Sequence, residues 1–138
     1  PQQAQQIKPT MVFQYAGDVP VYATSHLFTN SNDHAQYMDL NGVLFCDTPW
    51  LLSSTDPLRQ QVITQWPAAA GPLGRLYAMG VDAYRLAPRL SQLKTLPESR
   101  VDGMSGSLSM SQTRRVERQL PWAQFVDGKI QRLPDTAP

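Results

Sequence analysis

The sequence predicts an α/β fold in which short parallel strands and helices are followed by a C-terminal antiparallel hairpin. Three observations support this prediction. Apolar residues recur every three or four positions over 73–87, the period of one helical face. Two runs rich in β-branched and aromatic residues, 19–24 and 42–46, have the composition of strands. Asp127-Gly128 separates two further apolar runs, as in a two-residue hairpin.

The first third of the chain is predicted to contain a helix and then two strands. Apolar residues at helical spacing lie within 2–16, and Gly17 is a stop signal. Pro9 is expected to kink this helix or to delay its start. The two strands are separated by an 18-residue connection, 25–42, whose end has the pattern of one helical turn. Loops of this length are usually functional or mobile.

Two helices are predicted in the middle of the chain. After an apolar crossover at 47–54, Thr55 or Asp56 can cap a helix that begins at Pro57. A longer helix is expected to begin at Pro72 and to end or kink at Pro88, followed by a short second piece.

We expect the longer helix to bury its apolar face. The residues at helical spacing are Leu73, Leu76, Tyr77, Gly80, Val81, Tyr84 and Ala87. A glycine on this face predicts that another backbone approaches closely at Gly80.

The C-terminal part is predicted to be antiparallel. Residues 107–110 alternate between polar and apolar, as in a half-buried strand. The runs 122–126 and 129–133 flank Asp127-Gly128, which favours a type I′ turn. In that register Phe125 faces Ile130, and we expect both to share the buried face.

Composition limits the function classes. With 138 residues, 41% of them hydrophobic, the chain is predicted to form a single unit with a real core. The net charge of +1 argues against a dedicated nucleic-acid binder. No apolar run reaches the roughly 18 residues of a membrane-spanning helix.

No metal, cofactor or disulfide is predicted. Cys46 is the only cysteine, and within its apolar run it should behave as a small hydrophobe. His26 and His34 have no spacing typical of a metal pair on a helix face, so a solvated loop is favoured.

We predict no catalytic residue. Ser91 and Lys94 match the S-x-x-K pattern of penicillin-interacting serine enzymes, in which the lysine activates the serine. The accompanying S-D-N and K-T-G elements are absent, and so are the P-loop and G-x-S-x-G motifs. We therefore interpret the four-residue match as a coincidence.

Several runs, in this order, occur along almost the whole chain: 18–25 (DVPVYATS), 39–43 (DLNGV), 49–52 (PWLL), 74–86 (GRLYAMGVDAYRL), 90–93 (LSQL), 103–106 (GMSG) and 115–123 (RVERQLPWA). In these runs the chain closely resembles the C-terminal domain of the LppC/LpoA family. These proteins are outer-membrane lipoproteins that activate a penicillin-binding protein.

The resemblance implies a partial type I periplasmic-binding-protein-like fold, in which two α/β lobes enclose a cleft. It places a hinge crossing near 47–54 and the final hairpin at Asp127-Gly128. It also implies that most of the first lobe, the helical-repeat domain and the lipid-bearing cysteine belong to a longer protein. The element order agrees, because the chain opens on the helix of a βαβ unit without that unit's first strand. The isolated chain is then expected to expose apolar surface and to self-associate or be marginally stable.

The function implied by the resemblance is regulatory and non-catalytic. The protein is expected to bind and activate a bifunctional peptidoglycan synthase, a class A penicillin-binding protein 1A, and thereby to promote cell-wall cross-linking. Peptidoglycan is a second expected partner. The expected location is the periplasm, on the inner face of the outer membrane. Attachment to the membrane is expected only through a lipid anchor outside this sequence.

Two sets of residues are candidates for binding. Arg114, Arg115 and Arg118 are candidates for contact with the synthase, because arginine is enriched at interfaces. A solvated charged face is the alternative, since Glu117 interrupts the cluster.

The rival class is a periplasmic module that binds an amino acid or a cell-wall fragment in its cleft. Ser25 and His26, after the first strand, and Trp50, near the hinge, would then line the cleft, because ligands prefer crevices at strand ends. The sequence shows no charged clamp of the kind an amino-acid ligand requires.

Overall fold

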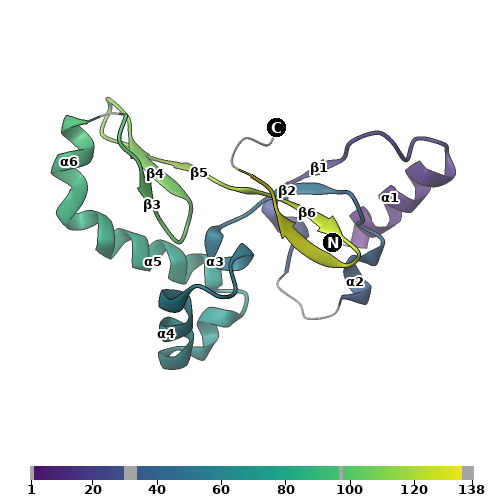
Figure 1. Cartoon of the computed structure of the whole chain (residues 1–138), viewed down its shortest axis with the longest axis horizontal. Helices are drawn as coiled ribbons and strands as arrows, with labels where there is room; N and C mark the ends of the chain where they lie inside the picture. The colour runs from purple at the N-terminus through teal and green to yellow at the C-terminus, as the bar shows by residue number, and fades with distance from the viewer. Residues whose placement is uncertain (1, 30–33, 97, 135–138) are drawn as a thin grey trace. The chain divides into compact units, whose positions relative to one another are not determined.

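The computed structural model describes residues 2–29, 34–96 and 98–134, which form two compact units. Unit 1 consists of Pro1–Asp47 and Pro121–Pro138, and unit 2 of Thr48–Leu120 (Figure 1). One junction between the units lies within 47–54, where we predict a hinge. That hinge and the single-unit organisation remain predictions. The centre of the long predicted connection, 30–33, lies outside the described residues.

Unit 1 is built on a four-stranded sheet with the order β1-β2-β6-β7. Its strands are β1 (Tyr22–Ala23), β2 (Leu44–Cys46), β6 (Trp122–Val126) and β7 (Lys129–Arg132). Strands β1 and β2 are parallel, whereas β6 is antiparallel to both β2 and β7. The predicted parallel pair and the C-terminal hairpin are therefore confirmed.

The hairpin has the predicted register, with Phe125 opposite Ile130 and Val126 opposite Lys129. Asp127 and Gly128 have φ values of 50° and 70°, as a type I′ turn requires.

The helices of unit 1 are α1 (Gln2–Phe13), the 3-10 helix η1 (Ser25–Leu27) and α2 (Ala35–Met38). The predicted turn near Tyr37 is confirmed as α2. The expectation that Pro9 delays the start of α1 is wrong, because the helix begins at Gln2 and continues through Pro9. No residue of α1 is buried, so water can reach the carbonyl group that the missing proline N–H leaves without a partner.

The core of unit 1 is a cluster of aromatic rings. Phe45 and Phe125 stack with ring centroids 4.7 Å apart, and Tyr37 stacks on Phe125 at 5.2 Å. Phe28 packs against all three rings. Such pairs add about 0.5–1.5 kcal/mol each beyond the burial of their area.

Unit 2 contains most of the helices and a three-stranded antiparallel sheet. The helices are α3 (Pro49–Leu52), α4 (Pro57–Gln65), η2 (Pro67–Ala70), α5 (Gly74–Leu86), η3 (Ala87–Arg89) and α6 (Leu90–Thr95). The strands β3 (Val101–Asp102), β4 (Ser107–Met110) and β5 (Val116–Gln119) lie in that order. The cap on α4 is confirmed, since Asp56 Oδ1 accepts from Arg59 N–H at 3.0 Å. Strands β3 and β5 are not predicted by the sequence.

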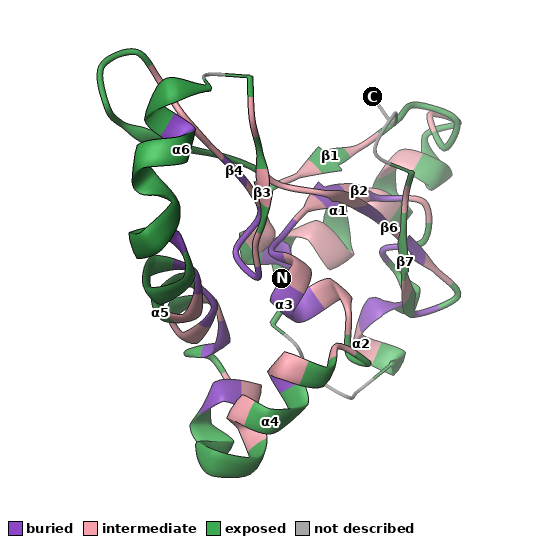
Figure 2. Ribbon diagram, turned by 60° about the vertical axis from the view of Figure 1, so that its left-hand side comes forward, coloured by how far each residue is buried: buried purple, intermediate pink, exposed green. Residues whose placement is uncertain are grey.

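The buried face of α5 differs from the prediction. Its buried residues are Gly74, Ala78, Asp82 and Leu86, four positions apart, and Figure 2 shows a buried strip along one side of the helix. Of the predicted face, Leu76 is 62% and Tyr84 84% exposed. The expected close approach at Gly80 is also wrong, because a Cβ there would meet nothing within 4 Å.

Small residues explain which side of α5 packs inward. A Cβ on Gly74 would lie 2.9 Å from the Ala69 carbonyl oxygen and 3.1 Å from Trp50 Nε1. Trp50 is fully buried, and its indole N–H donates to the Ala69 carbonyl at 3.0 Å. Close approach to a large ring therefore outweighs the hydrophobicity of the opposite face.

A buried carboxylate joins α5 to the turn between β3 and β4. Asp82 accepts hydrogen bonds from Met104 N–H at 2.8 Å, Ser105 N–H at 2.7 Å and Ser105 Oγ at 2.6 Å. The Met104 carbonyl in turn accepts from Trp50 N–H at 3.0 Å. Asp82 thus holds the turn on α5, and the Met104 carbonyl of the same turn binds α3.

Candidate interaction surface

The three predicted arginines lie on the β4–β5 hairpin of unit 2. Arg114 and Arg115 belong to its tip, 111–115, and Arg118 lies within β5. All three side chains are exposed, and no ion pair joins them to another described residue. The structure therefore brings the three candidates together on one exposed hairpin.

The hairpin tip is organised by Ser111. Ser111 N–H donates to the Arg115 carbonyl at 2.9 Å, and Arg114 N–H donates to the Ser111 carbonyl at 2.9 Å. Arg115 N–H also donates to Ser111 Oγ at 3.2 Å. Arg114 has a φ of 62°, a left-handed conformation that is uncommon for a residue other than glycine. The tip has defined geometry, and it presents two adjacent guanidinium groups.

Strand β5 is exposed along its whole length. All four of its residues are exposed, including Val116 at 43%. The stem of Arg118 covers Gly106, where an added Cβ would lie 2.7 Å from Arg118 Cγ. Arg100 lies at the far end of the strand and donates to Gln119 Oε1 at 2.7 Å. Basic groups thus occur at both ends of β5.

The residues predicted to line a ligand cleft are not brought together within one unit. Ser25 and His26 lie in η1 of unit 1, where His26 is exposed and its Nδ1 is 3.3 Å from Thr24 Oγ1. Trp50 belongs to unit 2, and its ring is enclosed in the core. The indole is therefore a packing element without an accessible face.

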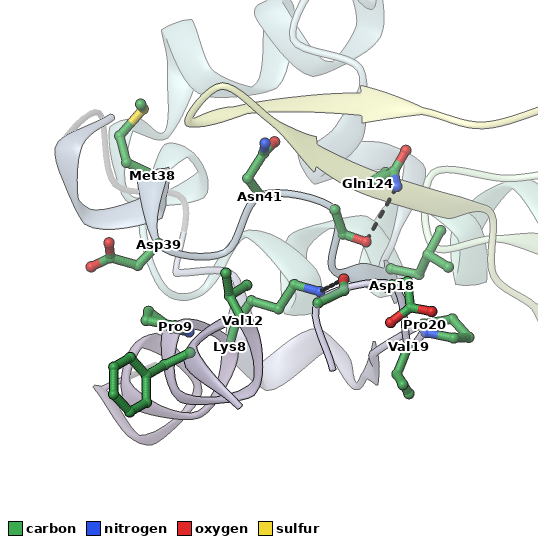
Figure 3. A pocket seen from close by; sticks show the side chains of 14 residues that line it. Lys8, Pro9, Val12, Asp18, Val19, Pro20, Met38, Asp39, Asn41 and Gln124 are labelled. Carbon is green, nitrogen blue, oxygen red and sulfur yellow. Dashed lines mark hydrogen bonds between the residues drawn. The ribbon is translucent and has the colours of Figure 1, made fainter. Parts of the chain in front are cut away.

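Unit 1 has an open hollow of about 730 Å³ between α1, the segment 17–20 and the loop before β2. Figure 3 shows two of its polar side chains bonded within the chain, whereas Asp18 and Asp39 carry no dashed line. Lys8 Nζ donates to the Gly17 carbonyl at 3.1 Å, and Gln124 Nε2 donates to the Gly42 carbonyl at 3.2 Å. Asn41 Oδ1 accepts from Asp127 N–H at 3.1 Å. The carboxylates of Asp18 and Asp39, which also line the hollow, have no bonding partner among the described residues.

Arg59 is a buried cation that the sequence does not reveal. It is 7% exposed, its guanidinium lies 6.0 Å from the centre of the Trp50 ring, and Nη1 donates to the Ser54 carbonyl at 3.3 Å. Burial lowers the pKa of Arg59, and the Asp56 carboxylate opposes that shift. Its Nε is buried without a hydrogen-bond partner. These contacts give Arg59 a packing role in unit 2.

The S-x-x-K match is the one enzyme-like motif of the sequence, and it lies on the surface of unit 2. Ser91 and Lys94, the two ends of the S-x-x-K match, both lie exposed on α6. No group of three or more His, Cys, Asp or Glu in 2–29, 34–96 and 98–134 could hold a metal ion. Within the same ranges, none of the helices combines the length and apolar character needed to cross a membrane.

Similar solved structures define the class of protein. The C-domain of LpoA (YraM) from Haemophilus influenzae, a regulator of PBP1A, has a TM-score of 0.79 and 29% identity, over 96% of this chain and 42% of that one. A "putative branched-chain amino acid ABC transporter" from Chromobacterium violaceum has a TM-score of 0.63 and 38% identity, over 90% of this chain and 39% of that one. The chain thus has the periplasmic-binding-protein-like α/β fold predicted from its sequence.

A match to a protein-family model shows the family to which the chain belongs. The model described as "LppC putative lipoprotein" matches residues 1–128, and the chain belongs to this lipoprotein family. A penicillin-binding protein activator LpoA of Vibrio cholerae is 38% identical over 101 residues, which are 71% of this chain and 17% of the relative. The LpoA of Edwardsiella ictaluri is 36% identical over 112 residues, 81% of this chain and 16% of the relative. The chain therefore spans about a sixth of the length of these relatives.

Proposed function

We propose that this chain is part of a non-catalytic activator of a class A penicillin-binding protein, and that it acts by binding the synthase and stabilising its active state. The observation that carries the proposal is the match of 96% of the chain to the C-domain of a regulator of PBP1A. The named activators at 36–38% identity support the same function.

The mechanism is one of differential affinity. A protein without catalytic groups can accelerate an enzyme only if it binds the active state more tightly than the inactive one. A tenfold preference for the active state corresponds to about 1.4 kcal/mol. The hairpin with Arg114, Arg115 and Arg118 is the proposed contact, because it is exposed, basic and without ion pairs to other described residues.

The location follows from the partner. We propose that the full-length lipoprotein acts in the periplasm, on the inner face of the outer membrane, where a lipid anchor would hold it close to peptidoglycan. Peptidoglycan itself is a second proposed partner.

The test uses the full-length protein and the class A synthase of the same bacterium. We expect binding at micromolar or lower concentration, and faster cross-linking of lipid-linked precursor in a reconstituted assay. The Rhodospirillum rubrum protein, with the same fold at a TM-score of 0.54 and 20% identity, is the control for an effect of fold alone.

Binding without acceleration would contradict the mechanism, and absence of binding would contradict the proposed function.

A thermal-shift screen with amino acids and cell-wall fragments tests the alternative function, a module that binds a small molecule. Stabilisation by several degrees would favour a small-molecule module.

A further inference from the structure

Strand β5 has a free edge. It pairs with β4 on one side, and no strand in the described part of the chain pairs with its other side. At the tip, Ser111 N–H donates to the Arg115 carbonyl, so these opposite residues occupy a hydrogen-bonded position, and the register continues from them with Met110 opposite Val116. Since bonded and non-bonded pairs alternate in an antiparallel ladder, Glu117 and Gln119 bond to β4. The N–H and C=O groups of Val116 and Arg118 therefore point towards the free edge.

The charge along this edge is mainly positive. Arg114 and Arg115 lie at one end of β5 and Arg118 lies within it, whereas Arg100 precedes β3, on the other side of β4, and reaches Gln119 with its guanidinium. Glu117 is the one acidic residue of the strand. The edge thus combines unpaired backbone donors and acceptors with the guanidinium groups of Arg114, Arg115 and Arg118.

We propose that β5 binds an extended, acidic segment of the partner by strand addition at this edge. The proposal rests on the proposed function and states where and how the synthase is bound. Backbone groups of the incoming strand pair with Val116 and Arg118, and its carboxylates contact the neighbouring arginines. Main-chain bonds supply affinity in this mode of recognition, and the side chains select the sequence.

A different role for the charges is protection of the edge. Charged side chains on edge strands prevent unwanted pairing between copies of a protein. The two roles make opposite predictions about the arginines. A docking site without Arg114 and Arg115 loses affinity for the synthase, whereas an edge without its protecting charges self-associates and binds the synthase as before.

The decisive variant is Val116→Pro in the full-length protein. Proline removes the outward N–H of Val116 without removing a bond to β4, and edge strands tolerate proline at such positions. Val116→Thr keeps the N–H and a similar shape, and it is the matched control. We expect Val116→Pro to weaken binding of the synthase by about tenfold or more, and Val116→Thr to bind like the wild type.

Two further measurements support the test. The double variant Arg114→Ala with Arg115→Ala should bind several-fold more weakly and depend less on salt. Amide hydrogen exchange in the wild-type protein should show new protection at Val116 and Arg118 when the synthase binds, which decides the question even if Val116→Pro does not fold.

Outcomes that overturn the inference are distinct from failure of the proposed function. Wild-type binding with an unaffected Val116→Pro variant, or without new protection at the two amides, overturns strand addition and leaves the proposed function in place. Self-association of the double arginine variant with unchanged synthase affinity assigns the charges to protection. Absence of wild-type binding overturns the proposed function and this inference with it.

Discussion

Two glycines of unit 2 occupy opposite environments. A Cβ on Gly103 would lie 2.4 Å from Asp82 Oδ2, a distance that real structures do not allow. Asp82 cannot yield easily, because three hydrogen bonds hold its carboxylate. Gly80 lies in α5 with nothing near its Cβ position. The first glycine is required by packing, and the second only weakens a helix.

At the residue scale we therefore predict opposite effects of the same substitution. Gly103→Ala should lower the free energy of unfolding by about 1–3 kcal/mol through overpacking. Gly80→Ala should raise it by about 0.5–1 kcal/mol, because alanine is the better helix former. Urea unfolding measures both. Equal destabilisation by the two variants would show that Gly80 has a packing role after all.

Asp82 determines how two elements of unit 2 meet. Its carboxylate replaces water around two backbone N–H groups and one hydroxyl in a buried turn. The sequence pattern does not single it out, since an acidic residue within an amphipathic helix is usually solvent-exposed. The partners that explain its burial lie more than 20 residues further along the chain.

At the element scale, Asp82→Ala should release the β3–β4 turn from α5. We expect a loss of about 3 kcal/mol or more, because buried donors lose a charged acceptor. Tyr84→Ala, on the exposed side of the same helix at 84% exposure, should change stability by less than about 0.5 kcal/mol. Thermal unfolding followed by circular dichroism compares the two. A similarly small effect of both variants would show that Asp82 does not hold the β3–β4 turn on α5.

The α4 helix shows how much local sequence can specify. Pro57 and the Asp56 cap define its start as predicted, because both act within one helical turn. Its buried residue is nevertheless Arg59, whereas Leu58, Val62 and Ile63 are half-buried. Local signals thus predict where the helix begins, and contact with Trp50 decides which side chain is enclosed.

At the scale of the whole molecule, the exposed apolar side of α5 has a consequence for behaviour in solution. Leu73, Leu76 and Met79 are 49%, 62% and 52% exposed. Large exposed apolar side chains at a spacing of three residues lie on one side of a helix, and apolar patches on a surface favour association. In an isolated 138-residue chain, the surface available is that of a second copy.

We accordingly predict that the isolated chain self-associates at concentrations of tens of micromolar. The double variant Leu76→Gln with Met79→Gln should shift it towards monomer, since glutamine keeps helix propensity and removes apolar area. Ile7→Gln, at a 56% exposed position of α1, is the control and should leave association unchanged. Sedimentation velocity measures the distribution, and a monodisperse wild-type monomer would refute the prediction.

The candidate binding residues show the same difference between what local sequence predicts and what long-range packing decides. The arginine cluster is visible in the sequence, but its position on a hairpin with a free strand edge depends on the pairing of β4 with β5. The position of Trp50 near the crossover predicts a place in a cleft, whereas long-range packing encloses its ring in the core of unit 2.

Local signals in the sequence are enough to predict the fold class, the family resemblance, the start of α4 and the register of the C-terminal hairpin. These features depend on spacing, proline and glycine signals that act over a few residues. Tertiary contacts determine which side of α5 is buried, why Asp82 and Arg59 are enclosed, and why one edge of β5 is left unpaired by the described strands. Each of these depends on contacts between residues far apart in the chain, where close packing outweighs local hydrophobic pattern.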